Sequence, residues 1–219
     1  MGDTHKPKRG SMAFSPRKRA RRHFGRVKSW PDTDSKEVRV QGFAGWKAGM
    51  THVLLRDTNP GSPSSGQEVR KAVTVVEVPP MRVLGVRGYR MTVYGMQTAG
   101  EAWADSEKLS ESIPELSRRV PKRLEHDSEA HHEALCEKAG SGGLCEVRLI
   151  VATQPHTMNS TSSKTPELME MGLTGGDLQA QLAWAKDQFG NEIGIQDVFL
   201  DGADIDVVGI TKGKGWQGS

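Results

Sequence analysis

The sequence predicts a mainly β protein with a small β-barrel, an α+β insertion and an extended basic arm at its N-terminus. Three observations predict this. Short strand-like runs lie close together with glycines at their bends, the middle of the chain changes to helical spacing, and positive charge is concentrated in the first 30 residues. A length of 219 residues allows one or two domains.

The basic arm is the first of these elements. Residues 1–30 hold ten Lys or Arg and one acid, a formal charge of +9, whereas the remaining residues sum to −6. The run from Pro16 to Arg22 (PRKRARR) cannot enter an apolar core, because burial of an unpaired charge is costly. We predict an extended arm over residues 1–37 that becomes ordered on a polyanion, with a solvated tail as the alternative.

Three charge zones follow the first 30 residues. Residues 31–100 carry +3, residues 101–206 carry −11, and the last thirteen residues hold two lysines and no acid. Since like charges repel, we expect the acidic middle to face away from a polyanion that the other zones bind.

Short strands are predicted between residues 38 and 94. Residues 38–43 and 51–55 read as strands around a turn at Gly45–Gly49, and residues 57–67 read as a loop. Residues 72–78 are β-branched and stop at two prolines. Two further strand pieces are expected between Val83 and Tyr94, broken by Gly85 and Gly88. This spacing favours a small barrel over an open sheet.

The middle of the chain predicts an α+β insertion. A polar helix is expected from Lys122 to Lys138, stopped by Gly140–Gly143, and residues 147–151 read as a strand. Thr174–Asp177 matches a capping box before an apolar helical stripe from Leu178 to Phe189, ended by Gly190-Asn191. Residues 205–210 return to a strand pattern. The predicted domains are therefore the arm 1–37, the first barrel part 38–94, the insertion 95–200 and a return strand with a basic loop, 201–219.

Two patterns suggest other chemistry. Gly209–Gly215 (GITKGKG) resembles a phosphate-binding loop, but its glycines have the wrong spacing for a nucleotide P-loop and no helix is expected behind it. His126, His131, His132, Cys136 and Cys145 invite a zinc hypothesis. Their spacing matches no standard ligand array, so a solvated helix face is favoured. No nucleophile–base spacing or carboxylate pair indicates an enzyme.

Targeting and aromatic signals complete the pattern. No apolar run is long enough to span a membrane, no apolar stretch follows the N-terminal bases, and two cysteines make no disulfide framework, so we expect a cytosolic chain.

Trp30, Trp46 and Trp216 lie beside bases or glycines, where an indole ring could stack on a nucleic-acid base. Trp103 and Trp184 are expected to be packing residues.

Several stretches together resemble one family. Pro7–Arg19 (PKRGSMAFSPRKR) resembles the start of the archaeal and eukaryotic branch of the large-subunit ribosomal protein L-three family. Gln41–His52 (QGFAGWKAGMTH) resembles its first barrel hairpin, and Val78–Arg82 and Val208–Gly218 are similar to two later signatures. The resemblance spans nearly the whole chain in order. The family continues into a long basic loop tipped by tryptophan, so the chain is expected to be a truncated form.

The resemblance implies a non-enzymatic structural constituent of the large ribosomal subunit with a translation-protein-type barrel, incomplete here. It implies binding to large-subunit rRNA, support of subunit assembly and a place near the peptidyl-transferase region, in cytoplasmic ribosomes. The expected partners are rRNA and neighbouring large-subunit proteins, without a membrane, a homo-oligomer, a cofactor or a metal. Alternatives are a phosphate-substrate enzyme using residues 209–215 and a DNA-binding protein with a basic tail.

The residues predicted to bind rRNA are mostly bases of the arm, with a few bases and tryptophans elsewhere. They are Lys6, Lys8, Arg9, Arg17, Lys18, Arg19, Arg21, Arg22, Arg26, Lys28, Trp30, Lys47, Arg82, Arg87, Lys212, Lys214 and Trp216.

Overall fold

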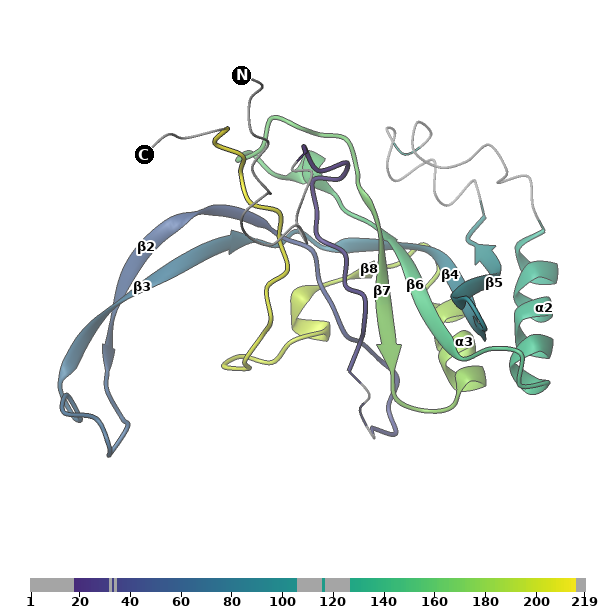
Figure 1. Ribbon diagram of the computed structural model, residues 1–219, viewed down its shortest axis with the longest axis horizontal. Helices are drawn as coiled ribbons and strands as arrows, with labels where there is room; N and C mark the ends of the chain where they lie inside the picture. Colours follow the sequence, from purple (N-terminus) through teal and green to yellow (C-terminus); the bar gives the residue numbers. More distant parts are fainter. Residues whose placement is uncertain (1–17, 32, 34, 106–115, 117–126, 216–219) are drawn as a thin grey trace, which may run out of the picture. The chain divides into compact units, whose positions relative to one another are not determined.

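A computed structural model describes residues 18–31, 33, 35–105, 116 and 127–215 of the chain. The chain divides into two units, one of which is Trp30–Ala203. The other combines Met1–Ser29 with Asp204–Ser219. In its described residues the larger unit is mostly β with two α-helices, which confirms the mainly β, α+β class (Figure 1). No closed barrel is found in the described part of the chain.

An antiparallel sheet forms the centre of the larger unit. Its strands run in the order β1-β7-β6-β4-β5, and β8 pairs with the start of β4. Their bounds are Arg39–Val40 for β1, Met81–Thr92 for β4, Gly95–Trp103 for β5, Glu146–Ala152 for β6, Leu168–Thr174 for β7 and Glu192–Ile193 for β8. The strand predicted at residues 147–151 is confirmed as β6. Of the strand predicted at residues 38–43, only β1 is formed.

β4 is a single strand, so the prediction that Gly85 and Gly88 break it in two was wrong. Both glycines are required by close packing instead. A Cβ on Gly85 would lie 2.4 Å from the carbonyl oxygen of Ala102, and a Cβ on Gly88 would meet Leu135 and Leu144 at 3.1 Å. The strand stays continuous because its pairing with β5 and β6 absorbs the irregularities as β-bulges.

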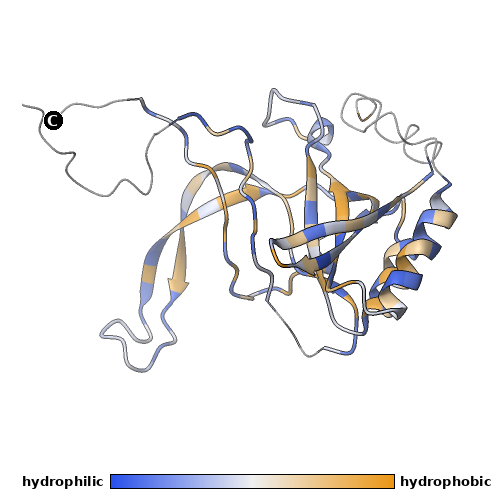
Figure 2. Cartoon of the chain, turned by 45° about the vertical axis from the view of Figure 1, so that its right-hand side comes forward, coloured by the Kyte–Doolittle hydropathy of each residue, from blue (hydrophilic) through white to orange (hydrophobic). Residues whose placement is uncertain are grey.

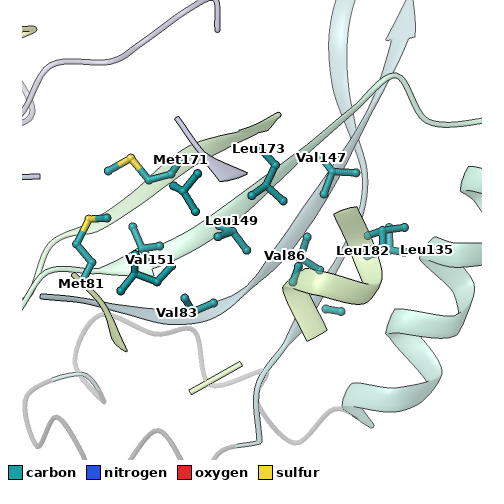
Figure 3. Packing of buried hydrophobic residues seen from close by; sticks show 14 of the residues in the cluster. Met81, Val83, Val86, Leu135, Val147, Leu149, Val151, Met171, Leu173 and Leu182 are labelled. Carbon is teal, nitrogen blue, oxygen red and sulfur yellow. The ribbon is translucent and has the colours of Figure 1, made fainter. Parts of the chain in front are cut away.

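Two helices, α2 (Ser128–Gly140) and α3 (Leu178–Asp187), cover one face of this sheet. Alternate residues of each strand point toward them, because successive side chains of a strand alternate between faces. Val83, Val86, Val147 and Leu149 are fully buried there, together with Leu182 (Figure 3). The apolar stripe predicted for α3 is therefore confirmed as core.

The helix boundaries differ in detail from the predictions. The expected start at Lys122 lies outside the described residues, and α2 has Asp127 as its N-cap, with the carboxylate accepting from the Ala130 amide at 3.4 Å. The capping box at Thr174–Asp177 was wrong, since Asp177 is the N-cap of α3 but makes no side-chain cap bond. Gly190, with φ +80°, follows the end of α3 as expected.

A separate two-stranded ribbon is formed by β2 (Trp46–Arg56) and β3 (Glu68–Glu77). The turn predicted at Gly45–Gly49 was wrong, because β2 runs through this stretch and pairs with β3 across a bulge between Lys47 and Gly49. Figure 2 shows apolar segments along this ribbon. Val76 and Val75 of β3 pair with Lys47 and Gly49 on the two sides of the bulge, and their β-branched side chains favour a strand, so the glycines of β2 need not end the pairing.

The loop predicted at residues 57–67 is confirmed and joins β2 to β3. Its carboxylate, Asp57, accepts from the Ser64 hydroxyl at 2.7 Å and from the Asn59 amide at 3.0 Å. Hydrogen bonds from the hydroxyls of Ser62 and Ser64 and from the Asn59 amide lower the pKa of Asp57 to about 2. The loop is thus closed by its own polar side chains.

The strand predicted at residues 205–210 was wrong, since this segment belongs to no strand and its residues are exposed. Its β-branched residues favour a strand, but a strand also needs a partner edge, and the described residues supply none here.

The packing of Trp30 on β7 yields a stability test. A Cβ on Gly172 would lie 2.6 Å from two atoms of the Trp30 ring. We expect Gly172→Ala to lower the free energy of unfolding by about 1–3 kcal/mol in urea denaturation, because the ring must shift.

Gly49→Ala is the control, since no atom lies within 4 Å of a Cβ there. It should change stability by less than about 0.5 kcal/mol. Equal stabilities of the two variants would contradict the role given to Trp30.

Candidate nucleic-acid interface

The described part of the basic arm, residues 18–31, is an extended segment without helix or strand. Its six bases are all exposed, and it contains no carboxylate. They are Lys18, Arg19, Arg21, Arg22, Arg26 and Lys28. Among the described residues, none of the six forms an ion pair, so their charges face solvent.

The C-terminal segment, residues 204–215, lies in the same unit as the arm. A Cβ on Gly25 would lie 2.6 Å from Val208 Cγ1 and 3.2 Å from the Val208 carbonyl carbon, so the two segments run in close contact. Lys212 and Lys214 are exposed on this segment. The structure therefore brings together two sets of bases that are far apart in the sequence.

Five predicted contact residues lie outside the described residues. They are Lys6, Lys8, Arg9, Arg17 and Trp216.

The β2–β3 ribbon carries a further set of exposed bases. The predicted Lys47 is exposed on β2. Arg56, Arg70 and Lys71 are also exposed and lie toward the end of the ribbon that the loop at residues 57–67 joins, and they are not among the residues predicted from the sequence. Arg70 lies opposite Leu54 and contacts the ring of His52, with 3.1 Å between Nη2 and Nδ1. The alternating strand pattern on each side of the polar loop at residues 57–67 could have indicated these exposed bases from the sequence.

Arg82 and Arg87, both predicted to bind rRNA, are engaged within the fold. Arg82 donates to the Gly190 carbonyl at 3.0 Å and lies 3.6 Å from the Glu192 carboxylate. Arg87 forms ion pairs with Glu101, at 2.7 Å, and with Glu170. Each guanidinium already has anionic partners, so neither presents a free charge to a phosphate.

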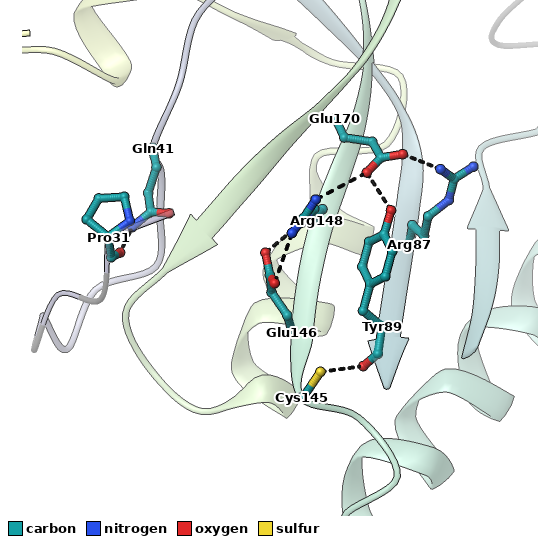
Figure 4. Close-up of polar contacts among 8 residues, drawn as sticks. All are labelled: Pro31, Gln41, Arg87, Tyr89, Cys145, Glu146, Arg148 and Glu170. Carbon is teal, nitrogen blue, oxygen red and sulfur yellow. Dashed lines mark hydrogen bonds and ion pairs between the residues drawn. The ribbon is translucent and has the colours of Figure 1, made fainter. Parts of the chain in front are cut away.

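Arg87 belongs to a polar network on the sheet face opposite the helices, made of Arg87, Tyr89, Glu101, Glu146, Arg148 and Glu170. Figure 4 shows all of these residues except Glu101. The Tyr89 hydroxyl donates to Glu170 at 2.5 Å, and burial together with this bond raises the pKa of Tyr89. Arg148 is 5% exposed, binds Glu146 through two nitrogens at 2.6 and 3.0 Å, and stacks 4.7 Å above the Tyr89 ring. The network gives each partly buried charge an oppositely charged partner.

Trp30 is packed against its own chain. Its ring lies against Gly42 and Gly172, and its buried indole nitrogen has no hydrogen-bond partner among the described residues. An indole held in this way does not present a free face to a base. The predicted stacking role of Trp30 therefore has no geometric support.

His132 and Cys136 lie together on α2, as their spacing predicts, with 3.7 Å between Nδ1 and Sγ. His132 is buried, and its Nε2 is 3.0 Å from the Leu182 carbonyl of α3. Burial raises the pKa of the Cys136 thiol, which is the opposite of what a metal-bound thiolate requires. In the part of the chain that is described, no three His, Cys, Asp or Glu side chains gather around a metal position. The pair therefore serves as an interhelical contact.

Among the described residues, no helix has the length and apolar character needed to cross a membrane.

Comparison with known proteins gives one consistent result. The family model described as Ribosomal protein L3 matches residues 1–219. The chain is similar to the large ribosomal subunit protein uL3 of Archaeoglobus fulgidus, with 44% identity over 214 residues, 98% of this chain and 61% of the relative. It is also similar to the uL3 proteins of Methanosphaerula palustris, 39% identical over 100% of this chain and 63% of the relative, and Methanopyrus kandleri, 44% identical over 97% and 57%. The chain thus spans about three fifths of the length of the curated relatives it matches.

The polar network predicts different effects for substitutions at two predicted contact residues. Substitution of Arg87 should change stability, and substitution of Lys47 should change RNA affinity. Arg87→Met leaves Glu101 and Glu170 with one partner fewer at a half-buried position. We expect it to lower the free energy of unfolding by about 1–3 kcal/mol, measured in urea, with unchanged affinity of the folded protein for RNA.

Lys47→Met is the matched control on the exposed ribbon. It should leave stability within about 0.5 kcal/mol of the parent and weaken RNA binding slightly. A loss of RNA affinity by Arg87→Met without loss of stability would contradict the structural role of Arg87.

Proposed function

Because the chain belongs to the ribosomal protein L3 family, we propose that it is a structural constituent of the large ribosomal subunit. It binds large-subunit rRNA, supports subunit assembly and lies near the peptidyl-transferase region, and it is not an enzyme. Its partners are rRNA and neighbouring large-subunit proteins, in ribosomes of the cytoplasm.

The observation that carries this proposal is the separation of charge. The six described bases of the arm and Lys212 and Lys214 are exposed within one unit. Residues 127–203, by contrast, hold twelve acids and four bases, a formal charge of −8. A polyanion is attracted to the first surface and repelled by the second.

Phosphate neutralisation explains how an extended arm can bind. Each base that approaches a backbone phosphate releases condensed counterions, which favours binding and makes it dependent on salt. Because the arm has no fold of its own in residues 18–31, it can follow the shape of the RNA. Glycines beside Lys212 and Lys214 allow the chain to approach the phosphates closely.

Not all the predicted contact residues keep this role. We assign rRNA contact to the arm bases, Lys47, Lys212, Lys214 and Trp216, and we add Arg56, Arg70 and Lys71 of the ribbon. Arg82, Arg87 and Trp30 are assigned to the fold, because their side chains are occupied within it.

The assignment of a barrel and of domain boundaries belongs to the same proposal. We infer that the β2–β3 ribbon is this chain's part of a small translation-type barrel. Its long exposed strands and apolar side chains, among them Leu54 at 65% exposed, support this inference. The division into arm 1–37, first barrel part 38–94, insertion 95–200 and C-terminal part 201–219 is proposed with it.

A phosphate-substrate enzyme would use residues 209–215. A P-loop needs a helix behind it, and none follows Gly209 within the described residues. A DNA-binding protein with a basic tail would prefer duplex DNA over rRNA. Neither alternative explains the similarity to ribosomal proteins over the whole chain.

Deletion of residues 1–28 tests the role of the arm, because it removes ten bases. The slope of log K against log salt for rRNA is about −0.7 per neutralised phosphate on single strands and about −0.9 on duplexes. We expect the deletion to make this slope several units shallower, in filter binding across a salt series.

Lys186→Ala is the control, because Lys186 lies on α3 in the acidic zone, 3.8 Å from Glu129. Its slope should equal that of the parent chain. An unchanged slope after deletion of the arm would contradict the proposed binding mode.

Lys212→Ala and Lys214→Ala separate a structural contact from an enzyme loop. As exposed single contacts, each should weaken rRNA binding by about 1 kcal/mol or less, and the double variant should lose more. Turnover of a phosphate substrate by the purified chain, lost in either variant, would overturn the structural reading.

A further inference from the structure

Two distant segments of the smaller unit, residues 18–29 and residues 204–215, approach each other most closely at one glycine. A Cβ on Gly25 would lie 2.6 Å from Val208 Cγ1, 3.2 Å from the Val208 carbonyl carbon and 3.3 Å from its oxygen. Any side chain at this position would push against the backbone of the other segment. Glycine is therefore the residue that lets the two segments come this near.

The arm turns its apolar and its basic residues in different directions around this contact. Phe24, Gly25 and Val27 are half-buried, whereas Arg26 and Lys28 are exposed. On the other segment the two lysines that follow Val208 are exposed as well. The close approach thus leaves the bases of both segments free to meet one ligand.

Packing is the contact that the structure shows between the two segments. Among the described residues, no hydrogen bond and no ion pair joins residues 18–29 to residues 204–215. Their charges sum to +6, because the arm holds six bases and the two lysines of the other segment are balanced by Asp204 and Asp206. A polyanion that neutralises both sets of bases at once would stabilise such a contact.

Holding two weak contacts together changes how each of them contributes to binding. When one set of bases binds an RNA backbone, the other set meets the same RNA at a high effective concentration, provided that the geometry allows both to bind. The contribution of Lys212 and Lys214 then depends on the contact between Gly25 and Val208. Two segments that bound RNA independently would show no such dependence.

We propose that Gly25 is a positioning residue that joins residues 18–29 and 204–215 into one composite site for a single stretch of rRNA backbone. This inference rests on the proposed function, because it takes rRNA as the ligand. It adds that the two sets of bases bind the same RNA stretch together. Gly25 acts through Lys212 and Lys214 and not through a phosphate contact of its own.

A double-mutant cycle in the full chain tests this proposal. Gly25→Val blocks the close approach, and Gly209→Val is the matched control, because no atom lies within 4 Å of a Cβ at Gly209. The double variant K212A/K214A is made in the parent chain and in each glycine variant. All these positions lie outside the unit Trp30–Ala203, so the thermal melt of that unit should be unchanged.

The cycle is measured as filter binding to large-subunit rRNA across a salt series. In the parent chain and in Gly209→Val, K212A/K214A should make the slope of log K against log salt about 1.4–1.8 units shallower. In Gly25→Val the slope should already be shallower by a similar amount. There, K212A/K214A should change it by less than about 0.5 units, because the lysines no longer reach the RNA that the arm binds.

Photocrosslinking gives a second measurement. Benzoylphenylalanine replaces His23 in one preparation and Val207 in another, since His23 is exposed and Val207 is 82% exposed. Each chain is bound to large-subunit rRNA and irradiated, and the adducts are mapped by primer extension. Both positions should label the same rRNA segment. In a Gly25→Val background, the adduct from position 207 should be lost from that segment.

Two results would overturn the composite site and leave the proposed function intact. One is an equal change of slope on K212A/K214A in Gly25→Val and in Gly209→Val. The other is labelling of separate rRNA segments from positions 23 and 207 of the parent chain. An rRNA affinity of the parent chain that does not vary with salt would instead overturn the proposed function itself.

Discussion

The fold depends on the burial of β4 between two partner strands. β4 is hydrogen-bonded to β5 and β6 along its edges, and Val83, Leu84 and Val86 are fully buried. Close approach at Gly85 and Gly88 allows β5 and the side chains of α2 to pack against it. This sheet provides the buried apolar core that the arm lacks. The arm can therefore carry a high positive charge and depend on a polyanion instead of a core.

Much of this arrangement could be predicted from the sequence, wherever a local residue pattern is compatible with only one secondary structure and one level of burial. The valine-rich run of β6 and the apolar stripe of Leu178, Leu182 and Ala185 specify a buried strand and a core helix. The exposure of the arm bases also follows directly, because a cluster of unpaired charges has no stable buried arrangement.

The remaining features depend on contacts between distant parts of the chain. Gly85 looks like a strand breaker in sequence, but the Ala102 backbone explains it. Arg87 looks like a phosphate ligand until Glu101 and Glu170, on other strands, occupy its guanidinium. Trp30 likewise meets Gly172 only after the sheet forms.

Hydrogen exchange of the chain, alone and with large-subunit rRNA, tests most directly whether the stable core and the RNA-binding residues lie in separate parts of the chain. In the free chain, the amides of Val83, Val86 and Leu149 should exchange slowest, and those of residues 18–28 and 204–215 fastest. Addition of rRNA should slow exchange in residues 18–28 and 204–215 and leave α2 and β6 unchanged. Protection of α2 and β6 by rRNA, with no change in residues 18–28, would contradict the account.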